Sequence, residues 1–204
     1  MRVGVIGLAG VGRIHINKWL EIAELVSVCD LDSTVLAQVA KSCQINGYRN
    51  VEQMLDKEDL QAISICTPPK SHLSITQQVA DRGIHVLCEK PMADTLGAAN
   101  DMMLVCRRNG MKLAVGHQRR WLPAYTLAKD LIADGEIGEV SFIKVYARDG
   151  LPNYSSHQAD LFRYLLSNAE CTWAMGNVER ETDRWARAIP IEDKALAVFG
   201  FDTG

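Results

Sequence analysis

The residues best suited to chemistry in this sequence are Glu89-Lys90-Pro91, which follow the apolar run Ile84-His85-Val86-Leu87-Cys88. A lysine at the carboxyl end of a buried strand lies where open α/β sheets bind their ligands. Pro91 has no backbone N–H and restricts the residue before it, so the turn around Lys90 is sharp and stiff. Most lysines in turns are solvated surface charges, so the interpretation of Lys90 depends on the motifs that accompany it.

A glycine-rich loop near the N-terminus predicts a nucleotide-binding site. Between the first apolar run and the first helical pattern lies Gly7-Leu8-Ala9-Gly10-Val11-Gly12. Gly7 permits a tight turn, and Gly12 lets the helix pack closely against the strand. Ala9 stands at the middle glycine of the usual Gly-x-Gly-x-x-Gly, with a glycine displaced to the next position. Phosphates would bind the N–H groups at the start of the helix, where Arg13 would add a charge.

An acidic residue at the end of the second apolar run indicates which dinucleotide this loop would bind. Asp30 lies 23 residues after Gly7, close to the spacing of about 20 at which an acidic residue accepts hydrogen bonds from the adenosine ribose. Its carboxylate would repel a 2′-phosphate, and Leu31 after it offers no compensating cation. The sequence therefore favours NAD as cofactor over NADP. A solvated turn aspartate is the alternative interpretation of Asp30.

Strand and helix patterns alternate through the first 116 residues and would position these motifs. Short continuous apolar runs, typical of strands covered on both faces, occur at Val3–Ile6, Leu25–Cys29, Ala62–Cys66, His85–Cys88 and Leu113–Val115. Helical patterns between them occupy Arg13–Ile22, Ser33–Ser42, Val51–Leu55, Ser71–Asp81 and Leu96–Arg108. The alternation predicts an α/β fold, with a doubly wound parallel sheet of Rossmann type over residues 1–121.

A different pattern begins after Gly116 and predicts a second domain over residues 122–204. Helices are expected at Ala124–Ala133 and His157–Leu166, and strands at Val140–Ala147, Thr172–Val178 and Ala195–Phe201. The strand at 140–147 has no crossover helix directly before it, which is typical of an α+β domain. The last strand has no partner after it, so we expect this domain to be incomplete at its C-terminus.

Composition limits the classes of protein to which the chain belongs. Its 204 residues are 48% hydrophobic and 23% charged with a net charge of -3, which is typical of a soluble globular protein. No basic stripe favours nucleic acid, and no apolar run approaches the roughly 20 residues of a membrane helix. The N-terminus lacks a signal-peptide pattern, so a cytoplasmic location is expected. The six cysteines include no Cys-x-x-Cys pair, which favours buried thiols over disulfides or a metal site.

Further motifs follow one another in order along the chain. They are Arg13-Ile14-His15 after the glycine loop, Thr67-Pro68-Pro69 followed by His72, Cys88-Glu89-Lys90-Pro91, Val115-Gly116-His117-Gln118-Arg119-Arg120 followed by Pro123 and Tyr125, and His157-x-x-Asp160-Leu161-x-Arg163-Tyr164-Leu165. This ordered set resembles the Gfo/Idh/MocA oxidoreductase family over essentially the whole chain. The resemblance implies a Rossmann domain, then a domain with a mostly antiparallel sheet, and an active site between them.

The resemblance also implies an activity and a set of site residues. Members of this family mostly oxidise or reduce a hydroxyl or carbonyl carbon of sugars, inositols and related polyols with NAD(P). Carried over by position, Lys90 would hydrogen-bond the reacting oxygen, and His157 would lie beside it. The expected cofactor-binding residues are Gly7, Ala9, Val11, Gly12, Arg13, Ile14, Asp30, Thr67, Pro68, Glu89, Lys90 and Gln118.

The oxidation of an alcohol needs a base for the hydroxyl proton and an electropositive group near the developing alkoxide. Lys90 suits the second role. Many polyol dehydrogenases of the family carry aspartate four residues before the motif histidine, where this chain has Asn153. An amide cannot act as the base, so we assign the proton transfer to His157. Asp160 is expected to orient a neighbouring group or to pair with Arg163.

Other polar residues have weaker predicted roles. Arg120 would meet an anionic substrate or the cofactor phosphates, with an interdomain salt bridge as the alternative. Together with Asn153 and Asp160 it completes the candidate substrate contacts. His72 is expected to cap or pack rather than to catalyse, and for His117 a structural and a functional role stay equally open.

The sequence therefore predicts a cytoplasmic, NAD-dependent oxidoreductase of a small sugar or polyol. A homo-oligomer is expected through the second-domain sheet, whose open face or edge needs cover. Two alternatives stay open. One is a non-catalytic NAD-binding regulator, and the other is an NAD-dependent glycosidase or lyase of the same family.

Overall fold

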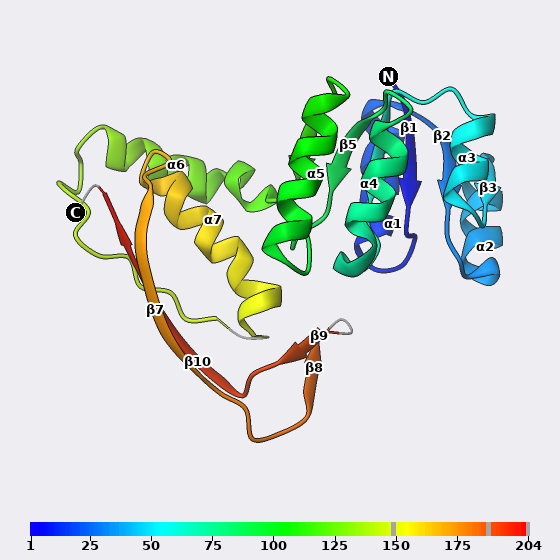
Figure 1. Ribbon diagram of the computed structural model, residues 1–204. Coiled ribbons are helices and arrows are strands. Elements are labelled where there is room, and N and C mark those ends of the chain that lie inside the picture. The colour runs from blue at the N-terminus through cyan, green and yellow to red at the C-terminus, as the bar shows by residue number, and fades with distance from the viewer. Residues whose placement is uncertain (148–149, 187–188, 203–204) are drawn as a thin grey trace. The chain divides into compact units, whose positions relative to one another are not determined.

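The protein consists of two compact units, Met1–Gly116 and His117–Gly204. The computed structural model describes residues 1–147, 150–186 and 189–202 (Figure 1). The assignment of a cofactor domain to residues 1–121 and of a substrate domain to residues 122–204 stays a prediction.

The first unit is built on a six-stranded sheet (Figure 1). Its strands are β1 (Arg2–Ile6), β2 (Glu24–Cys29), β3 (Asn46–Tyr48), β4 (Ala62–Ile65), β5 (His85–Cys88) and β6 (Leu113–Val115). All neighbours pair in parallel, in the order β3-β2-β1-β4-β5-β6, which confirms the predicted doubly wound α/β fold. The chain reverses its direction of travel across the sheet between β1 and β4, the point at which such sheets bind ligands.

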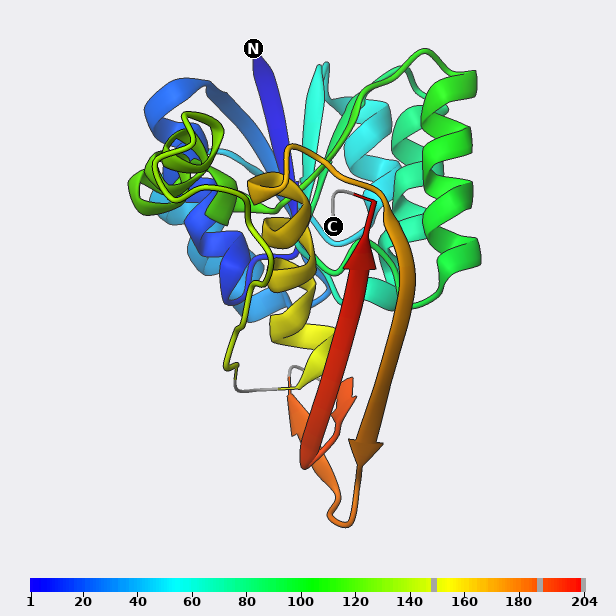
Figure 2. The ribbon, with the colours of Figure 1, turned by 90° about the vertical axis from the view of Figure 1, so that its left-hand side faces the viewer.

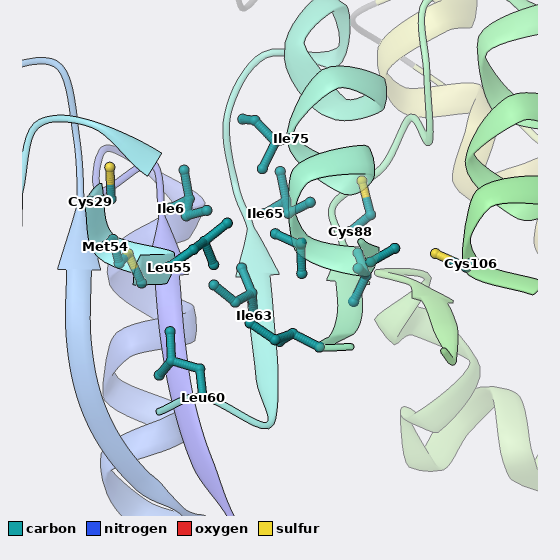
Figure 3. Close-up of a cluster of buried hydrophobic side chains, with 14 of the residues drawn as sticks. Ile6, Cys29, Met54, Leu55, Leu60, Ile63, Ile65, Ile75, Cys88 and Cys106 are labelled. Carbon is teal, nitrogen blue, oxygen red and sulfur yellow. The ribbon is translucent and has the colours of Figure 1, made fainter. Parts of the chain in front are cut away.

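Helices cover both faces of this sheet. They are α1 (Val11–Ile22), α2 (Ser33–Cys43), α3 (Val51–Lys57), α4 (His72–Ala80), preceded by the 3-10 turn η1 (Pro69–Ser71), and α5 (Leu96–Arg108). One buried cluster packs Ile16 of α1 and Leu36 of α2 against Val3 of β1. The other packs α3, α4 and α5 against the opposite face, where Ile63 and Ile65 of β4 lie among them (Figure 3). Because both faces are buried, the strands have continuous apolar sequences.

Local signals begin and end these helices. The side chains of Asp32, Asn50 and Thr95 accept hydrogen bonds from backbone N–H groups in the first turns of α2, α3 and α5. Gly83 and Gly110 have φ angles of 73° and 69° just after α4 and α5, the left-handed conformation that glycine adopts most readily. The helix bounds consequently agree with the sequence patterns to within two residues.

The second unit combines helices with a long two-stranded ribbon (Figure 2). Its elements are the 3-10 turn η2 (Gln118–Trp121), α6 (Pro123–Ala133), the π-helical turn η3 (Leu151–Ser155), α7 (Ser156–Leu165), β7 (Cys171–Glu179), β8 (Arg184–Ala186), β9 (Ile189–Ile191) and β10 (Lys194–Phe201). β7 pairs antiparallel with β10, and β8 with β9. The rings of Phe162 on α7 and Phe199 on β10 lie 6.2 Å apart, so one face of the ribbon packs toward α7. These pairings confirm the predicted small antiparallel sheet.

The strand predicted at 140–147 is wrong. These residues belong to no helix or strand, and the side chains of Phe142, Val145 and Tyr146 are exposed. An alternating apolar pattern favours an extended chain, but a strand also requires a neighbouring backbone to complete its hydrogen bonds. Among the described residues of this unit, the paired strands are β7 with β10 and β8 with β9.

The sequence patterns also do not predict three short strands, β3, β8 and β9. Each has only three residues, and Asn46, Arg184 and Pro190 interrupt the continuous apolar pattern that predicts the equally short β6. β3 is the sequence Asn46-Gly47-Tyr48 at the edge of the first sheet. A Cβ atom at Gly47 would lie 3.1 Å from the Cβ of Ala40 in α2, so contact with the helix rather than strand propensity selects this residue.

Candidate active site

The carboxyl ends of four neighbouring strands gather the candidate residues of the first unit at one edge of the sheet. Gly7 follows β1, Asp30 follows β2, Thr67 lies just beyond β4, and Glu89 follows β5. The N–H of Glu89 still donates to the carbonyl oxygen of Ile65 at 2.9 Å, so the start of the Lys90 turn is held as firmly as the strand before it.

The glycine loop between β1 and α1 has no room for a side chain at two positions. Gly7 has a φ of 88°, and a Cβ atom there would lie 2.8 Å from the backbone of Cys66. A Cβ atom at Gly12 would lie 2.0 Å from the carbonyl oxygen of Gly7. Gly10 is surrounded by open space but has a φ of 51°, so glycine is required there for its conformation. Ala9 is exposed beside it, and the displaced glycine thus takes the left-handed position of the loop.

The first turn of α1 is open to an anion. Gly10 precedes it without a side-chain hydrogen bond, and the turn contains no acidic residue. The first turns of α2, α3 and α5, by contrast, are capped by side chains. The N–H groups and the helix dipole favour a phosphate at such a position. Val11, Arg13 and Ile14 form this turn, and the Arg13 guanidinium donates to Oε1 of Gln38 at 3.4 Å.

Asp30 is held against the same loop. Its Oδ2 accepts the N–H of Leu8 at 2.7 Å, and its Oδ1 accepts the N–H of Asp32 at 2.9 Å. Each carboxylate oxygen can accept two hydrogen bonds, so both retain a position for a ribose hydroxyl. The guanidinium of Arg49 donates to the carbonyl oxygen of Leu31 at 3.3 Å. The fold therefore brings a cation to the residue after Asp30, which the sequence alone does not predict.

A buried histidine holds the loop that carries Thr67 and Pro68. The side chain of His72 is 1% exposed, with Nε2 2.7 Å from the carbonyl oxygen of Thr67 and Nδ1 3.0 Å from that of Met92. Ser71 donates to the Thr67 hydroxyl at 2.8 Å. The ring links the loop after β4 to the turn after β5, in agreement with the packing role predicted for His72.

Glu89 is buried next to Lys90 in the chain. It is 5% exposed, its Oε1 lies 3.1 Å from Nε2 of His15, and its Oε2 accepts the N–H of Lys90 at 3.1 Å. Burial acts to raise the pKa of the Glu89 carboxyl, but the hydrogen bond with His15, together with the backbone hydrogen bond and charge of Lys90, outweighs it, and the pKa lies below its usual value. Glu89 is therefore an ionised carboxylate. Lys90 itself is partly buried and precedes a cis peptide bond to Pro91.

In the second unit, His157 lies beside a partly buried ion pair. The residue is 4% exposed, and its ring packs edge-on against that of His117 with 5.8 Å between the centroids. Nδ1 of His117 lies 4.0 Å from a carboxylate oxygen of Asp160. The carboxylate accepts two hydrogen bonds from the guanidinium of Arg120, at 2.7 and 2.5 Å. The hydrogen bonds to Asp160 are the main reason that the pKa of the Arg120 guanidinium is raised.

The partner of Asp160 differs from the one predicted on its own helix. Asp160 pairs with Arg120 of η2, whereas Nε of Arg163 donates to the carbonyl oxygen of Ala169 at 3.4 Å. A bidentate guanidinium contact from another element is stronger than a pair between neighbouring turns of one exposed helix. The ion pair joins η2 to α7. The substrate contacts proposed for Arg120 and Asp160 stay predictions.

The remaining candidates of the second unit are less well placed. Gln118 is the first residue of η2 and is exposed. Asn153 belongs to η3, and its side chain lies outside the described residues. A cavity of about 520 Å³ lies within this unit, and Leu151, Gln158 and Phe162 are among its lining residues. The roles predicted for Gln118 and Asn153 stay predictions.

Two features are absent from the described residues. These residues contain no group of three or more histidine, cysteine, aspartate and glutamate side chains placed to hold a metal ion. In the same part of the chain, every helix is too short or too polar to cross a membrane.

Sequence reasoning gave no role to three residues of a hydrogen-bond chain that leads to Glu89, namely Trp19, Ser64 and His15. Nδ1 of His15 lies 3.1 Å from Oγ of Ser64, and the indole N–H of Trp19 donates to the same oxygen at 2.7 Å. His15 and Trp19 are four residues apart and so lie on one face of α1. The available signal was a serine inside the apolar strand Ala62-Ile63-Ser64-Ile65, because a buried hydroxyl needs a polar partner.

Comparison with known proteins assigns the fold to a family. Residues 1–117 match the family model GFO_IDH_MocA, described as an oxidoreductase family with an NAD-binding Rossmann fold. The chain belongs to this family. The resemblance inferred from the sequence motifs is thereby confirmed.

Relatives extend the similarity beyond the Rossmann unit. The D-apiose dehydrogenase of Paraburkholderia graminis is 31% identical over 98% of this chain and 57% of its own length. The scyllo-inositol 2-dehydrogenase (NAD(+)) of Bacillus subtilis is 29% identical over 100% of this chain and 65% of its own. The chain thus spans less than two thirds of the length of either relative.

Solved structures show the same architecture across both units. The WlbA dehydrogenase of Bordetella pertussis, in complex with NADH and UDP-GlcNAcA, has a TM-score of 0.84 at 26% identity and covers 100% of this chain and 68% of its own. A probable dehydrogenase from Thermotoga maritima has a TM-score of 0.89 at 22% identity and covers 100% of this chain and 66% of its own. The second similarity shows a shared fold.

The residues of the first unit fit the NAD that this family binds. The close contacts at Gly7 and Gly12 leave no room for side chains there, so the loop presents backbone to a ligand. The first turn of α1 has no side-chain cap, which leaves it open to a pyrophosphate. The carboxylate of Asp30 is fixed by two N–H donors and can still accept hydrogen bonds from a ribose.

Proposed function

We propose that this chain is an NAD-dependent oxidoreductase that transfers a hydride between NAD and a hydroxyl or carbonyl carbon of a sugar, inositol or related polyol. The observation that carries the proposal is the edge of the first sheet, where the glycine loop, Asp30 and the Lys90 turn follow neighbouring parallel strands. Relatives named as dehydrogenases of D-apiose and scyllo-inositol support the substrate class.

The chain's own groups would hold the cofactor, which when bound supplies the hydride acceptor. The N–H groups of the first turn of α1 would bind its pyrophosphate, and Asp30 would accept hydrogen bonds from the adenosine ribose. The rest of the cofactor would be lined by Thr67, Pro68, Glu89, Lys90 and Gln118. The buried Glu89 would contribute through the backbone it fixes, since its carboxylate is enclosed between His15 and the N–H of Lys90.

Lys90 would donate a hydrogen bond to the reacting oxygen. An ammonium group at this point stabilises the negative charge that develops on the oxygen as the hydroxyl proton leaves, which lowers the barrier to hydride transfer. Its position at the carboxyl end of β5, fixed by the hydrogen bonds of Glu89, supports this role.

His157 would take the hydroxyl proton during oxidation and return it during reduction. An imidazole suits proton transfer near neutral pH. The carboxylate of Asp160 accepts two hydrogen bonds from Arg120, which fix its orientation. We therefore assign Asp160 to the ordering of α7 and of the neighbouring His117, and the proton transfer to His157.

The test is turnover by the purified protein with NAD⁺ and a panel that includes D-apiose, myo-inositol, scyllo-inositol and related polyols, followed by NADH absorbance. We expect NADH to form with at least one of them, and NADH to bind at least about tenfold more tightly than NADPH because Asp30 repels a 2′-phosphate. The proposal would be contradicted if the protein binds the cofactor but neither oxidises any polyol of the panel nor reduces the corresponding ketone. Glycoside cleavage without net NADH would favour the glycosidase or lyase alternative.

A homo-oligomer through the ribbon is a further part of the proposal. Trp173 and Met175 of β7 lie on one face of the ribbon with Leu196 of β10, and all three are exposed. The opposite face carries Phe199, which contacts α7. An apolar sheet face of this kind supports association between copies. Sedimentation of the protein before and after Met175→Lys would test it, since a charge on that face should shift the equilibrium toward monomer.

A cytoplasmic location also belongs to the proposal. All six cysteines are free thiols, and three of them, Cys29, Cys88 and Cys106, are buried. Free thiols persist in reducing compartments. Fractionation of cells that express the tagged protein would test the location.

A further inference from the structure

A chain of hydrogen bonds runs from helix α1 to the turn that carries Lys90. The indole N–H of Trp19 donates to Oγ of Ser64 at 2.7 Å, and Oγ lies 3.1 Å from Nδ1 of His15. On its other side, Nε2 of His15 lies 3.1 Å from Oε1 of Glu89. The remaining carboxylate oxygen, Oε2, accepts the backbone N–H of Lys90 at 3.1 Å. The side chains of α1 thereby reach the residue proposed to contact the substrate.

The carboxylate at the end of the chain fixes the tautomer of His15. Oε1 of Glu89 only accepts, so the hydrogen of the ring lies on Nε2, and the Ser64 hydroxyl, which accepts the indole N–H of Trp19, donates to Nδ1 of a neutral ring. A neutral imidazole that accepts at Nδ1 carries its hydrogen on Nε2. That hydrogen faces a carboxylate oxygen of Glu89, which only accepts. The network thus assigns the Nε2–H tautomer to His15.

Burial makes the contact between His15 and Glu89 important for Glu89. Ser64 is fully buried, Glu89 is 5% exposed, and the His15 side chain is 13% exposed. An ionised carboxylate in such a place is stable only while hydrogen-bond donors face it. The carboxylate of Glu89 has no space to turn toward β6, since even a Cβ atom at Gly116 would lie 2.8 Å from its Oε1. His15 is therefore the side chain that keeps this carboxylate in position.

The neighbouring thiols do not compete for this charge. Burial, and after it the charge of Glu89, raise the pKa of Cys88 to about 12 and raise that of Cys66 as well. Both thiols consequently stay protonated. Glu89 carries the negative charge at this point of the sheet, and the groups that face its two oxygens are the imidazole of His15 and the backbone N–H of Lys90.

We propose that His15 is a positioning residue for Lys90 and acts through Glu89. It fixes the carboxylate, and the carboxylate fixes the backbone N–H of the residue whose side chain meets the reacting oxygen. The inference rests on the catalytic role proposed above for Lys90. A displacement of a reacting group by about 1 Å costs on the order of 100-fold in turnover, so the loss of this contact should reduce turnover without a comparable loss of cofactor affinity.

A matched pair of substitutions separates the contact from the mere presence of a side chain. His15→Gln places an amide N–H near the position of Nε2 and preserves the donor to Glu89. His15→Asn places its amide near the position of Nδ1, so it keeps the contact with Ser64 and loses the one with Glu89. His85→Gln is the control, because His85 lies at the opposite end of β5, where its Nδ1 accepts the N–H of Lys112 at 3.1 Å.

The first measurement needs no substrate. Amide hydrogen exchange by NMR should be about tenfold or more faster at Lys90 in His15→Asn, because its N–H loses a fixed acceptor. The same amide should exchange at the wild-type rate in His15→Gln and His85→Gln. Unchanged exchange at Lys90 in a folded His15→Asn protein would overturn the proposal. If that variant does not fold, the imidazole ¹⁵N chemical shifts of His15 in the wild type provide the test. A neutral ring with its hydrogen on Nδ1 would overturn the proposal equally.

The second measurement is kinetic and uses the polyol on which the protein is most active. We expect His15→Asn to lower kcat about 10- to 100-fold, with the Kd for NADH within about threefold of wild type, and His15→Gln to restore kcat. A decrease in NADH affinity with kcat unchanged would overturn the positioning role. Lys90→Ala separates the two proposals. If Lys90→Ala is inactive while His15→Asn is fully active, only the positioning proposal fails, whereas full activity of Lys90→Ala removes the catalytic role of Lys90.

Discussion

The six-stranded sheet of the first unit and the β7–β10 ribbon of the second differ in how they are covered. Strand β4 is buried at every residue, because helices pack on both faces of its sheet. Strand β7 is exposed at every residue except Glu179. A sheet covered on both faces can hold ionised and polar groups firmly at its edge, as it does for Glu89 and Asp30. The second unit instead holds its candidate residues through the ion pair between α7 and η2.

The difference extends to how each candidate catalytic residue is positioned. Lys90 follows a buried strand, and its backbone is fixed by a carboxylate that is itself hydrogen-bonded. His157 lies on a helix, where its neighbour His117 is close to the Asp160–Arg120 pair. The first arrangement depends on the packing of one unit's core, and the second on charge contacts between two short elements.

The largest expected effect is on turnover, and it tests whether both units contribute to the chemistry. Lys90→Ala and His157→Ala should each lower kcat by about 10²- to 10⁴-fold, the range for loss of an acid, base or oxyanion donor. NADH affinity, measured by fluorescence, should change little in either variant. Lys112→Ala is the control, as an exposed lysine at the opposite end of the sheet. A large loss for Lys90→Ala alone would confine the chemistry to the first unit.

The contrast in cover predicts unequal costs for similar substitutions in the two sheets. Ile63→Ala should lower the free energy of unfolding by about 2 to 5 kcal/mol, because the residue is fully buried in β4. Leu196→Ala in β10 should cost at most about 0.5 kcal/mol under conditions where the protein is monomeric, since Leu196 is 65% exposed. Chemical denaturation measures both. Similar costs would mean that the ribbon face is covered in solution.

The glycine loop offers a smaller and more local test. Gly12→Ala places a Cβ atom 2.0 Å from the Gly7 carbonyl oxygen, so α1 must shift away from β1. We expect a loss of about 1 to 3 kcal/mol in the free energy of unfolding and weaker NADH binding. Gly97→Ala in α5 is the matched control, since nothing lies near its Cβ position and alanine favours a helix. NADH titration that shows equal affinity for both variants would contradict a cofactor role for this loop.

The smallest effect concerns charges in the second unit. Arg120→Ala leaves Asp160, whose side chain is 11% exposed, without its bidentate partner. We expect a cost of about 1 to 2 kcal/mol, below the value for a fully buried pair. Arg180→Ala removes an exposed pair with Asp183 and should cost less than about 1 kcal/mol. Thermal unfolding of both variants at low and high salt distinguishes them, because salt weakens the exposed pair more.

The sequence predicts the first unit closely because its signals are local and agree with one another. Five of the six strands are continuous apolar runs, and caps or glycines bound the helices. The same patterns fail at 140–147 and at the three short strands, where pairing depends on a neighbouring backbone that no local pattern specifies. The family motifs locate the glycine loop, Asp30 and the Lys90 turn, since all three follow from the ends of predicted strands.

The contacts of the candidate site could not be predicted in the same way. Helix spacing would allow Asp160 to pair with Arg163, yet its partner is Arg120, which lies 40 positions earlier in the sequence. His15 and Ser64 are 49 residues apart, and Ser64 appears in the sequence only as an irregularity in an apolar strand. Arg49 reaches the residue after Asp30 from the end of β3. The two contacts of the first unit join elements whose adjacency depends on the sheet order, and the Asp160–Arg120 pair joins η2 to α7.

What the sequence by itself determined is the alternation of strands and helices, the loop that requires glycine, and the acid and lysine at strand ends, because each depends on backbone sterics and periodicity within a few residues. Only the tertiary structure decided which side chains surround them. It buried Glu89, gave it His15 as a partner and paired Asp160 with Arg120. The physical reason is that a buried charge or hydroxyl must find its partner in space, and in this chain the partners belong to elements that are neighbours in the fold and distant in the sequence.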